Sequence, residues 1–382
     1  MLDNDGVTPR STYRDGQILT DTLGKDKTYD QLIFIGRFQP LHYGHMRVID
    51  IGLQRSKKLI MLVGSANIGR TLRNPFTFQE RFAMIATEYQ DMIDAGKLVI
   101  LPLNDYTYMD EQWIEAVQNI HDQEQIGPNT GLIGCEKDHT SYYLGLFPQW
   151  GNIGVEFRSP LNSTDVRKAV FLQHKLWNEH AAYKGDPTNI TNNHYDFIEK
   201  ACPAGITGML HHFVYTDEAR EIRLEWLWIE KYRKERQTSK FPIIEQTVDA
   251  CVIQSGHVLV VQRGQRPGVG KLALPGGFLD EDEPIKHGIL RELREETKID
   301  VSDTVLKANM MGSYRFDDPK RSDRGRIITD CGLFKLQDRP ELPKVKGSDD
   351  AKKAFWLPLN KVEPREFFED HAFLIRNLAA KI

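Results

Sequence analysis

The sequence predicts an α/β protein of two domains, a doubly wound parallel sheet followed by an α+β unit. At 382 residues the chain exceeds the roughly 250–300 residues at which a single hydrophobic core stops growing. Up to about residue 236, apolar runs alternate with helical patterns, which is typical of a parallel sheet covered by helices. After Pro242 the runs become β-rich. We therefore predict a flexible polar extension over residues 1–28, a first domain over 29–236, a linker over 237–242 and a second domain over 243–382.

Four short apolar runs predict the strands of the first domain, at 31–36, 58–64, 97–101 and 130–134. An amphipathic pattern from about His42 and another over Trp113–His121 predict helices between them. The stretch 216–240 alternates in charge around two tryptophans and predicts a helix that closes this domain. In a doubly wound sheet, ligands bind at the carboxyl ends of the strands, so residues that follow these runs are candidates for a site.

The second domain begins with two β-rich runs, at 247–253 and 257–263, which a Gln-Ser-Gly turn joins into a predicted hairpin. A helix is predicted over Pro284–Glu296, and further strands at Ile327–Leu336 and Ala354–Leu357. Strands that precede and follow one helix indicate an α+β arrangement.

Composition excludes several classes of protein. A net charge of −4 argues against general binding of nucleic acid, which requires a strongly basic face. The four cysteines lie far apart without zinc spacing, which indicates free thiols in a reducing compartment. The N-terminal stretch has no apolar core, and no apolar run approaches the roughly 18 residues of a membrane span. We expect a soluble, cytoplasmic protein whose partners are small molecules.

The first chemical motif is the string Gly36–His45, GRFQPLHYGH, at a predicted strand-to-helix junction. A helix N-terminus offers free N–H groups to phosphate, and His42 and His45 share one face of the first turn. The string resembles the signature of the HIGH-type nucleotidyltransferases, whose domain is Rossmann-like. The resemblance implies that both histidines stabilise the charge that develops when a nucleophile attacks the α-phosphate of ATP. The candidate nucleotide-binding residues of this string are Gly36, Arg37, Phe38 and Gly44.

The second motif is Leu161–Arg167, LNSTDVR, about 120 residues further on. It resembles the ISSTxxR signature of the same superfamily, with Asn162 in place of the first serine. The resemblance implies that Ser163, Thr164 and Arg167 hold the β- and γ-phosphates of ATP. Without the first motif, Ser-Thr would indicate only an ordinary helix N-cap.

Two further segments indicate the acceptor. Arg70–Arg81, RTLRNPFTFQER, and Gly134–Asp138 with the aromatic residues after it resemble the archaeal-type nicotinamide mononucleotide (NMN) adenylyltransferases. The resemblance implies that NMN attacks ATP to give NAD and pyrophosphate, with Mg²⁺ bound through the ATP phosphates. In that family a tryptophan stacks on the nicotinamide ring, and Trp113 is our candidate; the alternative is a core anchor. For Arg70 the alternative is a surface salt bridge. The further candidates are Asn74, Asp110, Lys137 and Asp138.

The third motif runs from Gly277 through Glu283 and, after seven residues, Arg291–Ile299. Glu292, Glu295 and Glu296 are spaced i, i+3 and i+4, so they project from one helical face, where hard oxygen ligands suit Mg²⁺ or Mn²⁺. The pattern resembles the Nudix box, which implies a mixed sheet sandwiched by helices, metal binding and activation of water. Glu283 would assist the metal ligands, Arg291 would orient a carboxylate, and the identity of the general base stays open. Lys298 stands where the box has glycine, so we expect a different helix end.

Two features indicate the substrate of this second domain: a set of arginines, and the order of the two domains along the chain. Arg263 and Arg266 precede the box beside Gly276 and Gly277, and Arg324 lies in a loop, 317–326, that resembles one in ADP-ribose pyrophosphatases. The tandem order resembles bifunctional NMN adenylyltransferase/Nudix hydrolases, which implies cleavage of ADP-ribose to AMP and ribose 5-phosphate. Two alternatives are another nucleoside diphosphate derivative and a non-catalytic module that senses ADP-ribose. The sequence leaves open the metal, the choice between NMN and nicotinate mononucleotide, homo-oligomer formation and communication between the sites.

Overall fold

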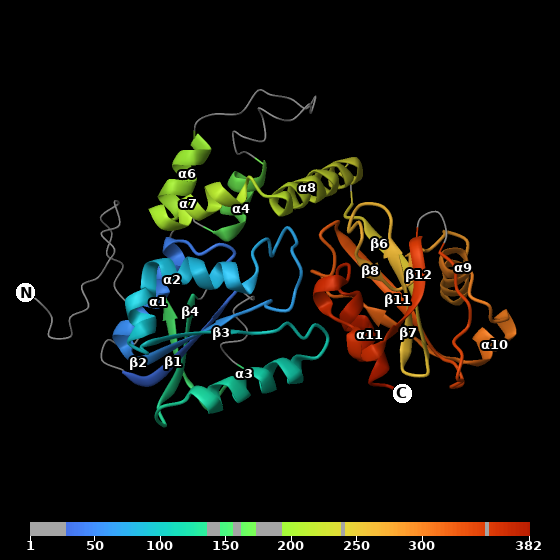
Figure 1. The fold of residues 1–382 in the computed structure, drawn as a ribbon, viewed down its shortest axis with the longest axis horizontal. Coiled ribbons are helices and arrows are strands. Elements are labelled where there is room, and N and C mark those ends of the chain that lie inside the picture. Colours follow the sequence, from blue (N-terminus) through green and yellow to red (C-terminus); the bar gives the residue numbers. More distant parts are fainter. Residues whose placement is uncertain (1–27, 136–145, 156–161, 173–192, 238–240, 348–350) are drawn as a thin grey trace, which may run out of the picture. The chain divides into compact units, whose positions relative to one another are not determined.

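The computed structural model describes residues 28–135, 146–155, 162–172, 193–237, 241–347 and 351–382. Compactness divides the chain into two units, described separately below (Figure 1). Unit 1 comprises 1–66, 73–105 and 111–219, and unit 2 comprises 67–72, 106–110 and 220–382. The predicted boundaries at 236 and 243 stay predictions, and the predicted extension falls almost wholly outside the described residues. In the described part of the chain, no helix is long and apolar enough to span a membrane.

Unit 1 contains a five-stranded sheet in the order β3-β2-β1-β4-β5, and every pair is parallel. The strands are β1 (Tyr29–Gly36), β2 (Ser56–Val63), β3 (Leu98–Pro102), β4 (Thr130–Cys135) and β5 (Gly151–Val155). The strand order reverses between β1 and β4, which is where such sheets open a crevice for ligands. The predicted doubly wound parallel sheet is confirmed.

The helices of unit 1 are α1 (Tyr43–Arg55), α2 (Phe78–Asp94), α3 (Asp110–Glu124), α4 (Ser163–Leu172), α6 (Asn193–Ala201) and α7 (Ala204–Phe213). A capping box between Thr77 and Glu80 begins α2, a helix that we did not predict because its first turn belongs to the acceptor motif. Ile33, Ile60, Leu62 and Leu132 of the sheet pack with Val117 of α3 in one core cluster. This packing holds the strand ends, and therefore the loops after them, in fixed register.

Unit 2 contains a mixed seven-stranded sheet. Its strands are β6 (Ile244–Gln254), β7 (His257–Arg263), β8 (Leu272–Ala273), β9 (Gly276–Phe278), β10 (Met310–Phe316), β11 (Arg326–Lys335) and β12 (Ala351–Pro358). Only the pairing of β11 with β6 is parallel among the described pairs. The predicted hairpin joins β6 to β7 through Ser255 and Gly256, at φ 46° and 72°, as a two-residue turn with two positive φ angles requires.

Helices cover both faces of this second sheet (Figure 1). From β6, Val248, Ala250 and Val252 pack toward α9 (Ile285–Thr297), whereas Cys251 and Ile253 pack toward α11 (His371–Ala379). The period of two along one strand thus builds two cores, and the predicted sandwich is confirmed. The remaining helices are α8 (Asp217–Arg236), which crosses the unit boundary, α10 (Asp303–Ala308) and the short 3₁₀ turns η2 (Leu359–Lys361) and η3 (Pro364–Glu366).

Our expectation of a different end for α9 is wrong. Lys298 adopts the left-handed conformation that glycine would have supplied, with φ 43° and ψ 37°, and its N–H donates to the carbonyl of Arg294. Since a β-carbon disfavours this conformation, the helix ends as in the usual box but at an energetic cost.

Candidate active sites

The first candidate site lies at the N-terminus of α1. His42 is the N-cap residue, and its Nδ1 accepts a hydrogen bond of 3.1 Å from the N–H of Gly44. The ring of His45 stacks on the ring of His42 at 3.8 Å between centroids, and Phe38 packs edge-on against His45 at 5.0 Å. His42 is buried and His45 is half-buried. Both imidazoles are therefore fixed at a helix start, where the helix dipole places partial positive charge.

The second motif meets the first at the backbone of Gln39 and Pro40. Arg167 donates from Nη1 to the Gln39 carbonyl at 2.7 Å and from Nη2 to Thr164 Oγ1 at 3.0 Å. Ser163 Oγ lies 3.5 Å from the Pro40 carbonyl oxygen. Asn162, which replaces serine in the signature, accepts from the Asp165 N–H at 3.0 Å, so the substitution keeps a helix cap. Two strings far apart in sequence thus form one site.

The acceptor motif is attached to the same loop through its Phe76 and Arg81. Gln39 exchanges two hydrogen bonds with the backbone of Phe76, at 2.8 and 2.9 Å. Arg81 is only 1% exposed and donates to the carbonyls of Arg37, at 2.8 Å, and Gly64, at 2.6 Å. Burial lowers the pKa of Arg81 to about 10. Sequence reasoning missed Arg81 as a contributor, although it is the last residue of the quoted motif.

The other predicted residues of this site are spread over both units. Arg37 is exposed and Asn74 is half-buried. Arg70 and Asp110 belong to the two short segments that group with unit 2. Trp113 is half-buried and packs against the core cluster of α3, with its ring 6.3 Å from Phe147. Lys137 and Asp138 lie outside the described residues, directly after the end of β4 at Cys135.

The second candidate site lies along α9, where Arg291 is surrounded by carboxylates. Its guanidinium pairs with Glu283, with Glu292 at 2.8 Å and with Glu295 at 3.2 Å. The hydrogen bonds that Arg291 donates, above all to Glu283, raise the pKa of Arg291, and the same pair lowers the pKa of Glu283. The arrangement agrees with the orienting role that the resemblance implies for Arg291.

Glu296, one helical turn after Glu292, lies beside the Leu-Pro-Gly-Gly turn. It accepts from the N–H of Gly276 at 3.0 Å. Burial raises the pKa of Glu296 to about 7, and the neighbouring carboxylates Glu292 and Asp249 add to the rise. A β-carbon on Gly277 would lie 2.6 Å from Glu292 Oε1. A β-carbon on Gly276 would clash with the backbone carbonyl oxygen of Val248, so glycine is required where this turn passes β6.

The carboxylates of α9 are oxygen ligands of the kind that divalent cations such as Mg²⁺ and Mn²⁺ prefer. Burial raises the pKa of both Glu292 and Glu296, so a nearby cation would relieve the cost of their charge. In the described residues, however, no three His, Cys, Asp or Glu side chains are grouped so as to hold a metal ion, because Arg291 takes up three of the carboxylates. Metal binding by Glu283, Glu292, Glu295 and Glu296 stays a prediction.

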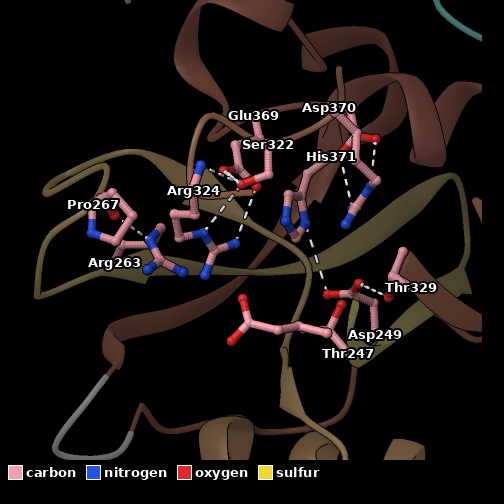
Figure 2. Close-up of polar contacts among 12 residues, drawn as sticks. Thr247, Asp249, Arg263, Pro267, Ser322, Arg324, Thr329, Glu369, Asp370 and His371 are labelled. Carbon is pink, nitrogen blue, oxygen red and sulfur yellow. Dashed lines mark hydrogen bonds and ion pairs between the residues drawn. The ribbon is translucent and has the colours of Figure 1, made fainter. Parts of the chain in front are cut away.

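A cavity of about 410 Å³ adjoins Glu296. Its lining includes the five residues predicted to bind the Nudix substrate, namely Arg263, Arg266, Gly276, Gly277 and Arg324. Figure 2 shows Arg263 and Arg324 together on one side, Asp249 with Thr329 on the other, and His371 between them. The cavity thus brings together residues of several strands, two loops and the start of α11.

The three predicted arginines differ in their environment. The guanidinium carbons of Arg263 and Arg324 lie 4.2 and 5.6 Å from the centre of the Phe368 ring. Arg324 also pairs with Glu369 at 3.2 Å. Arg266 is held by two carboxylates of α8, Glu221 and Glu225, each at 2.7 Å. A phosphate would meet Arg266 only in competition with these two partners.

Sequence reasoning missed the residues that hold this cavity together. Asp370 forms a bidentate pair with Arg321, with both contacts at 3.0 Å. Tyr108, from the short segment that groups with unit 2, donates to the same carboxylate at 2.6 Å. His371 Nδ1 accepts from the N–H of Leu274 at 3.1 Å, and burial keeps its pKa well below the usual value. The sequence signal for these residues was the consecutive string Glu369-Asp370-His371 at the start of α11.

The chain was compared with known families, sequences and solved structures. A cytidylyltransferase-like model matches residues 33–129, and a NUDIX domain model matches residues 244–378. The nicotinamide/nicotinic acid mononucleotide adenylyltransferase of Acinetobacter baylyi is 37% identical over 145 residues, 37% of this chain and 76% of that protein. The nicotinamide-nucleotide adenylyltransferase of Saccharolobus solfataricus is 32% identical over 38% of this chain and 82% of that protein. The chain belongs to the nicotinamide-nucleotide adenylyltransferase family.

A solved structure extends the similarity across both units. The crystal structure of a bifunctional NMN adenylyltransferase/ADP ribose pyrophosphatase from Francisella tularensis, complexed with AMP and a manganese ion, is 34% identical, with a TM-score of 0.79. The match covers 93% of this chain and 99% of that chain. The family resemblance and the fold class predicted from sequence are confirmed, whereas the roles of individual residues stay predictions.

Proposed function

We propose that this chain is a bifunctional enzyme of NAD metabolism. Unit 1 transfers an adenylyl group from ATP to NMN and releases pyrophosphate, and the Nudix domain hydrolyses ADP-ribose to AMP and ribose 5-phosphate. The names of the similar proteins from Acinetobacter, Saccharolobus and Francisella support both activities. Cytoplasmic residence belongs to the proposal, because Cys202, Cys251 and Cys331 are buried free thiols.

The observation that carries the first activity is the meeting of two phosphate-binding motifs at one loop. The start of α1 offers the positive end of a helix dipole and two fixed imidazoles, and Arg167 is anchored to the Gln39 carbonyl 2.7 Å away. Such a site can hold a triphosphate in line with an attacking phosphate, since positioning and neutralisation of charge drive this transfer. His42 and His45 would stabilise charge at the α-phosphate, and Arg167, Ser163 and Thr164 would bind the departing pyrophosphate. Mg²⁺ would enter with ATP.

The second activity is supported by the cavity beside α9. Arg263 and Arg324 offer positive charge at one end, where a pyrophosphate would bind. Glu283, Glu292, Glu295 and Glu296 would hold Mg²⁺ or Mn²⁺, which supplies neutralisation of charge and acidification of water when bound. Arg291 holds Glu283, Glu292 and Glu295 in place through its ion pairs. Glu296, buried against Gly276, can accept a proton near neutral pH.

The test assays both reactions in the full chain. His45→Ala should lower NAD formation from NMN and ATP by at least about 100-fold while AMP release from ADP-ribose is unchanged. Glu296→Gln should do the reverse when Mg²⁺ or Mn²⁺ is present. Exposed residues of the same types provide matched controls, and His212→Ala and Glu281→Gln should leave both rates unchanged.

Three outcomes would contradict the proposal. Loss of both activities in either variant would show that the sites are not independent. Unaltered hydrolysis in Glu296→Gln would exclude the metal assignment. Absence of AMP release by the wild type over a panel of ADP-ribose and other dinucleotides would reduce the Nudix domain to a binding module.

A further inference from the structure

Asp249 lies on β6 at a position that faces the hydrophobic core, where an apolar side chain is expected. Along this strand Cys251 and Ile253, on the same face, belong to the core beneath α11. The side chain of Asp249 is only 6% exposed, yet it lines the cavity. A carboxylate buried on a core face is strongly unfavourable unless its oxygens find donors. The sheet gives no reason for an acid at this position.

The two oxygens of this carboxylate differ in their partners. Oδ2 accepts a hydrogen bond of 2.5 Å from Thr329 Oγ1. Oδ1 lies 3.9 Å from His371 Nδ1, which already accepts from the Leu274 N–H and therefore cannot donate in the neutral ring. Among the residues that the structure describes, no donor lies within hydrogen-bond distance of Oδ1. A buried acceptor that faces a cavity without a donor indicates a ligand that supplies one.

The distribution of charge along the cavity excludes phosphate as that ligand group. Beside Asp249, the guanidinium of Arg321 is 2% exposed and is neutralised by its bidentate pair with Asp370. At the other end lie Arg263 and Arg324 (Figure 2), whose guanidinium groups contact the Phe368 ring. A phosphate is therefore attracted to the arginine end and repelled by Asp249. The group at Asp249 must therefore donate hydrogen bonds and cannot be an anion.

We propose that Asp249 determines specificity for the sugar at the far end of the diphosphate, by accepting hydrogen bonds from its hydroxyl groups at Oδ1. Arg263 and Arg324 then bind the diphosphate, and a cavity of about 410 Å³ has room for both groups. The inference rests on the proposed hydrolysis of a nucleoside diphosphate sugar and identifies the residue that recognises the sugar hydroxyl groups.

The test compares two ligands that differ only in the sugar. One is ADP-ribose, and the other is ADP whose β-phosphate carries a methyl group in place of ribose. Binding to the full-length wild type is measured by calorimetry, and hydrolysis is measured with Mn²⁺. The wild type should bind ADP-ribose about 10–100-fold more tightly, as expected for hydrogen bonds to a charged acceptor. Asp249→Asn presents an amide N–H₂ to the cavity while Thr329 keeps an acceptor, so this preference should disappear.

Asp330→Asn is the matched control. Asp330 is an equally buried acid on the neighbouring β11, but it accepts from Gln246 and Arg315 and does not line the cavity. It should leave the preference for ADP-ribose unchanged.

Several results would overturn the inference. Equal binding of both ligands by the wild type would overturn the inference. This result requires no variant, so the test remains decisive even if Asp249→Asn folds poorly. Equal weakening of both ligands in Asp249→Asn, or a raised requirement for Mn²⁺ with the sugar preference intact, would assign Asp249 to structure or to the metal instead. A wild type that binds ADP-ribose preferentially but releases no AMP would refute the proposed hydrolysis and support the inference.

Discussion

Around α1 the functional side chains are held mainly by backbone atoms, whereas two buried arginines at the cavity of unit 2, Arg321 and Arg324, are held by carboxylate side chains. His42 accepts from the Gly44 N–H, and Arg167 and Arg81 donate to the carbonyls of residues 39, 37 and 64. In unit 2, by contrast, Arg321 depends on Asp370 and Arg324 on Glu369. Backbone anchors are present whatever the neighbouring side chain is. Side-chain anchors disappear with one substitution.

The difference teaches where each site is vulnerable. A site held by backbone should lose chemistry without stability when a functional residue is replaced. A cavity held by buried ion pairs should lose stability when a residue that never touches substrate is replaced, because the remaining partner keeps an uncompensated charge. The following predictions test this contrast, from the largest effect to the smallest.

The largest effect is expected from Asp370→Ala. This change leaves Arg321 buried without its partner, which should lower the free energy of unfolding of unit 2 by about 3–5 kcal/mol. Denaturation of the full chain, followed through the loss of ADP-ribose hydrolysis, measures it. Lys57→Ala is the control in unit 1, because its pair with Asp30 is exposed and its removal should have no measurable effect. Equal effects of both changes would contradict the contrast.

His42→Asn should separate chemistry from stability in unit 1. Asparagine keeps a side-chain acceptor for the Gly44 N–H but lacks the imidazole, so NAD formation should fall about 10²–10³-fold while the melting temperature is unchanged. His42→Ala should lose the same activity and a further ~1 kcal/mol of stability with the helix cap. If His42→Asn still forms NAD at the wild-type rate, the role of His42 is limited to capping α1.

His371→Asn should change the response of unit 2 to acid. Burial holds the pKa of His371 well below its usual 6.5, so the unfolded chain binds a proton that the native state refuses. This contribution to stability is complete above pH 6.5 and is lost as the pH falls, by up to about 1.4 kcal/mol per pH unit.

Asparagine still accepts from the Leu274 N–H and does not titrate, so His371→Asn should flatten the slope of stability between pH 6.5 and 5. Urea unfolding at several pH values measures it. The exposed His287, replaced in the same way, should leave the slope unchanged. An identical slope in wild type and His371→Asn would show that the imidazole binds protons equally in the native and unfolded states, which would contradict a lowered pKa.

The smallest effect is expected at the end of α9. Lys298→Gly should raise the free energy of unfolding by about 1 kcal/mol, because glycine adopts the left-handed conformation without a clash of its β-carbon. Lys298→Ala keeps the β-carbon and should give no gain. Thermal denaturation of the three proteins decides between them, and equal gains from glycine and alanine would point to the lysine charge.

Local sequence determined the elements and the contiguous strings of both sites. Apolar runs predicted β1, β2, β3, β4, β6 and β7, because burial on both faces selects such runs. Helical spacing predicted that Glu292 and Glu296 share α9. The short strands β8 and β9 were not predicted, since they have only two and three residues and exist through pairing with β7 and β6.

Tertiary structure alone decided what surrounds the cavity. The partners of Arg321 and Arg324 lie 49 and 45 residues further along the chain, and no local pattern relates them. In the sequence, Asp249 is one polar residue within an apolar run. Only the register of the folded sheet places it opposite Gly276 and near His371. The physical reason is that a hydrogen bond or ion pair depends on distance in space. Sequence fixes that distance within a helix or strand, whereas across the fold it is set by packing of the whole core.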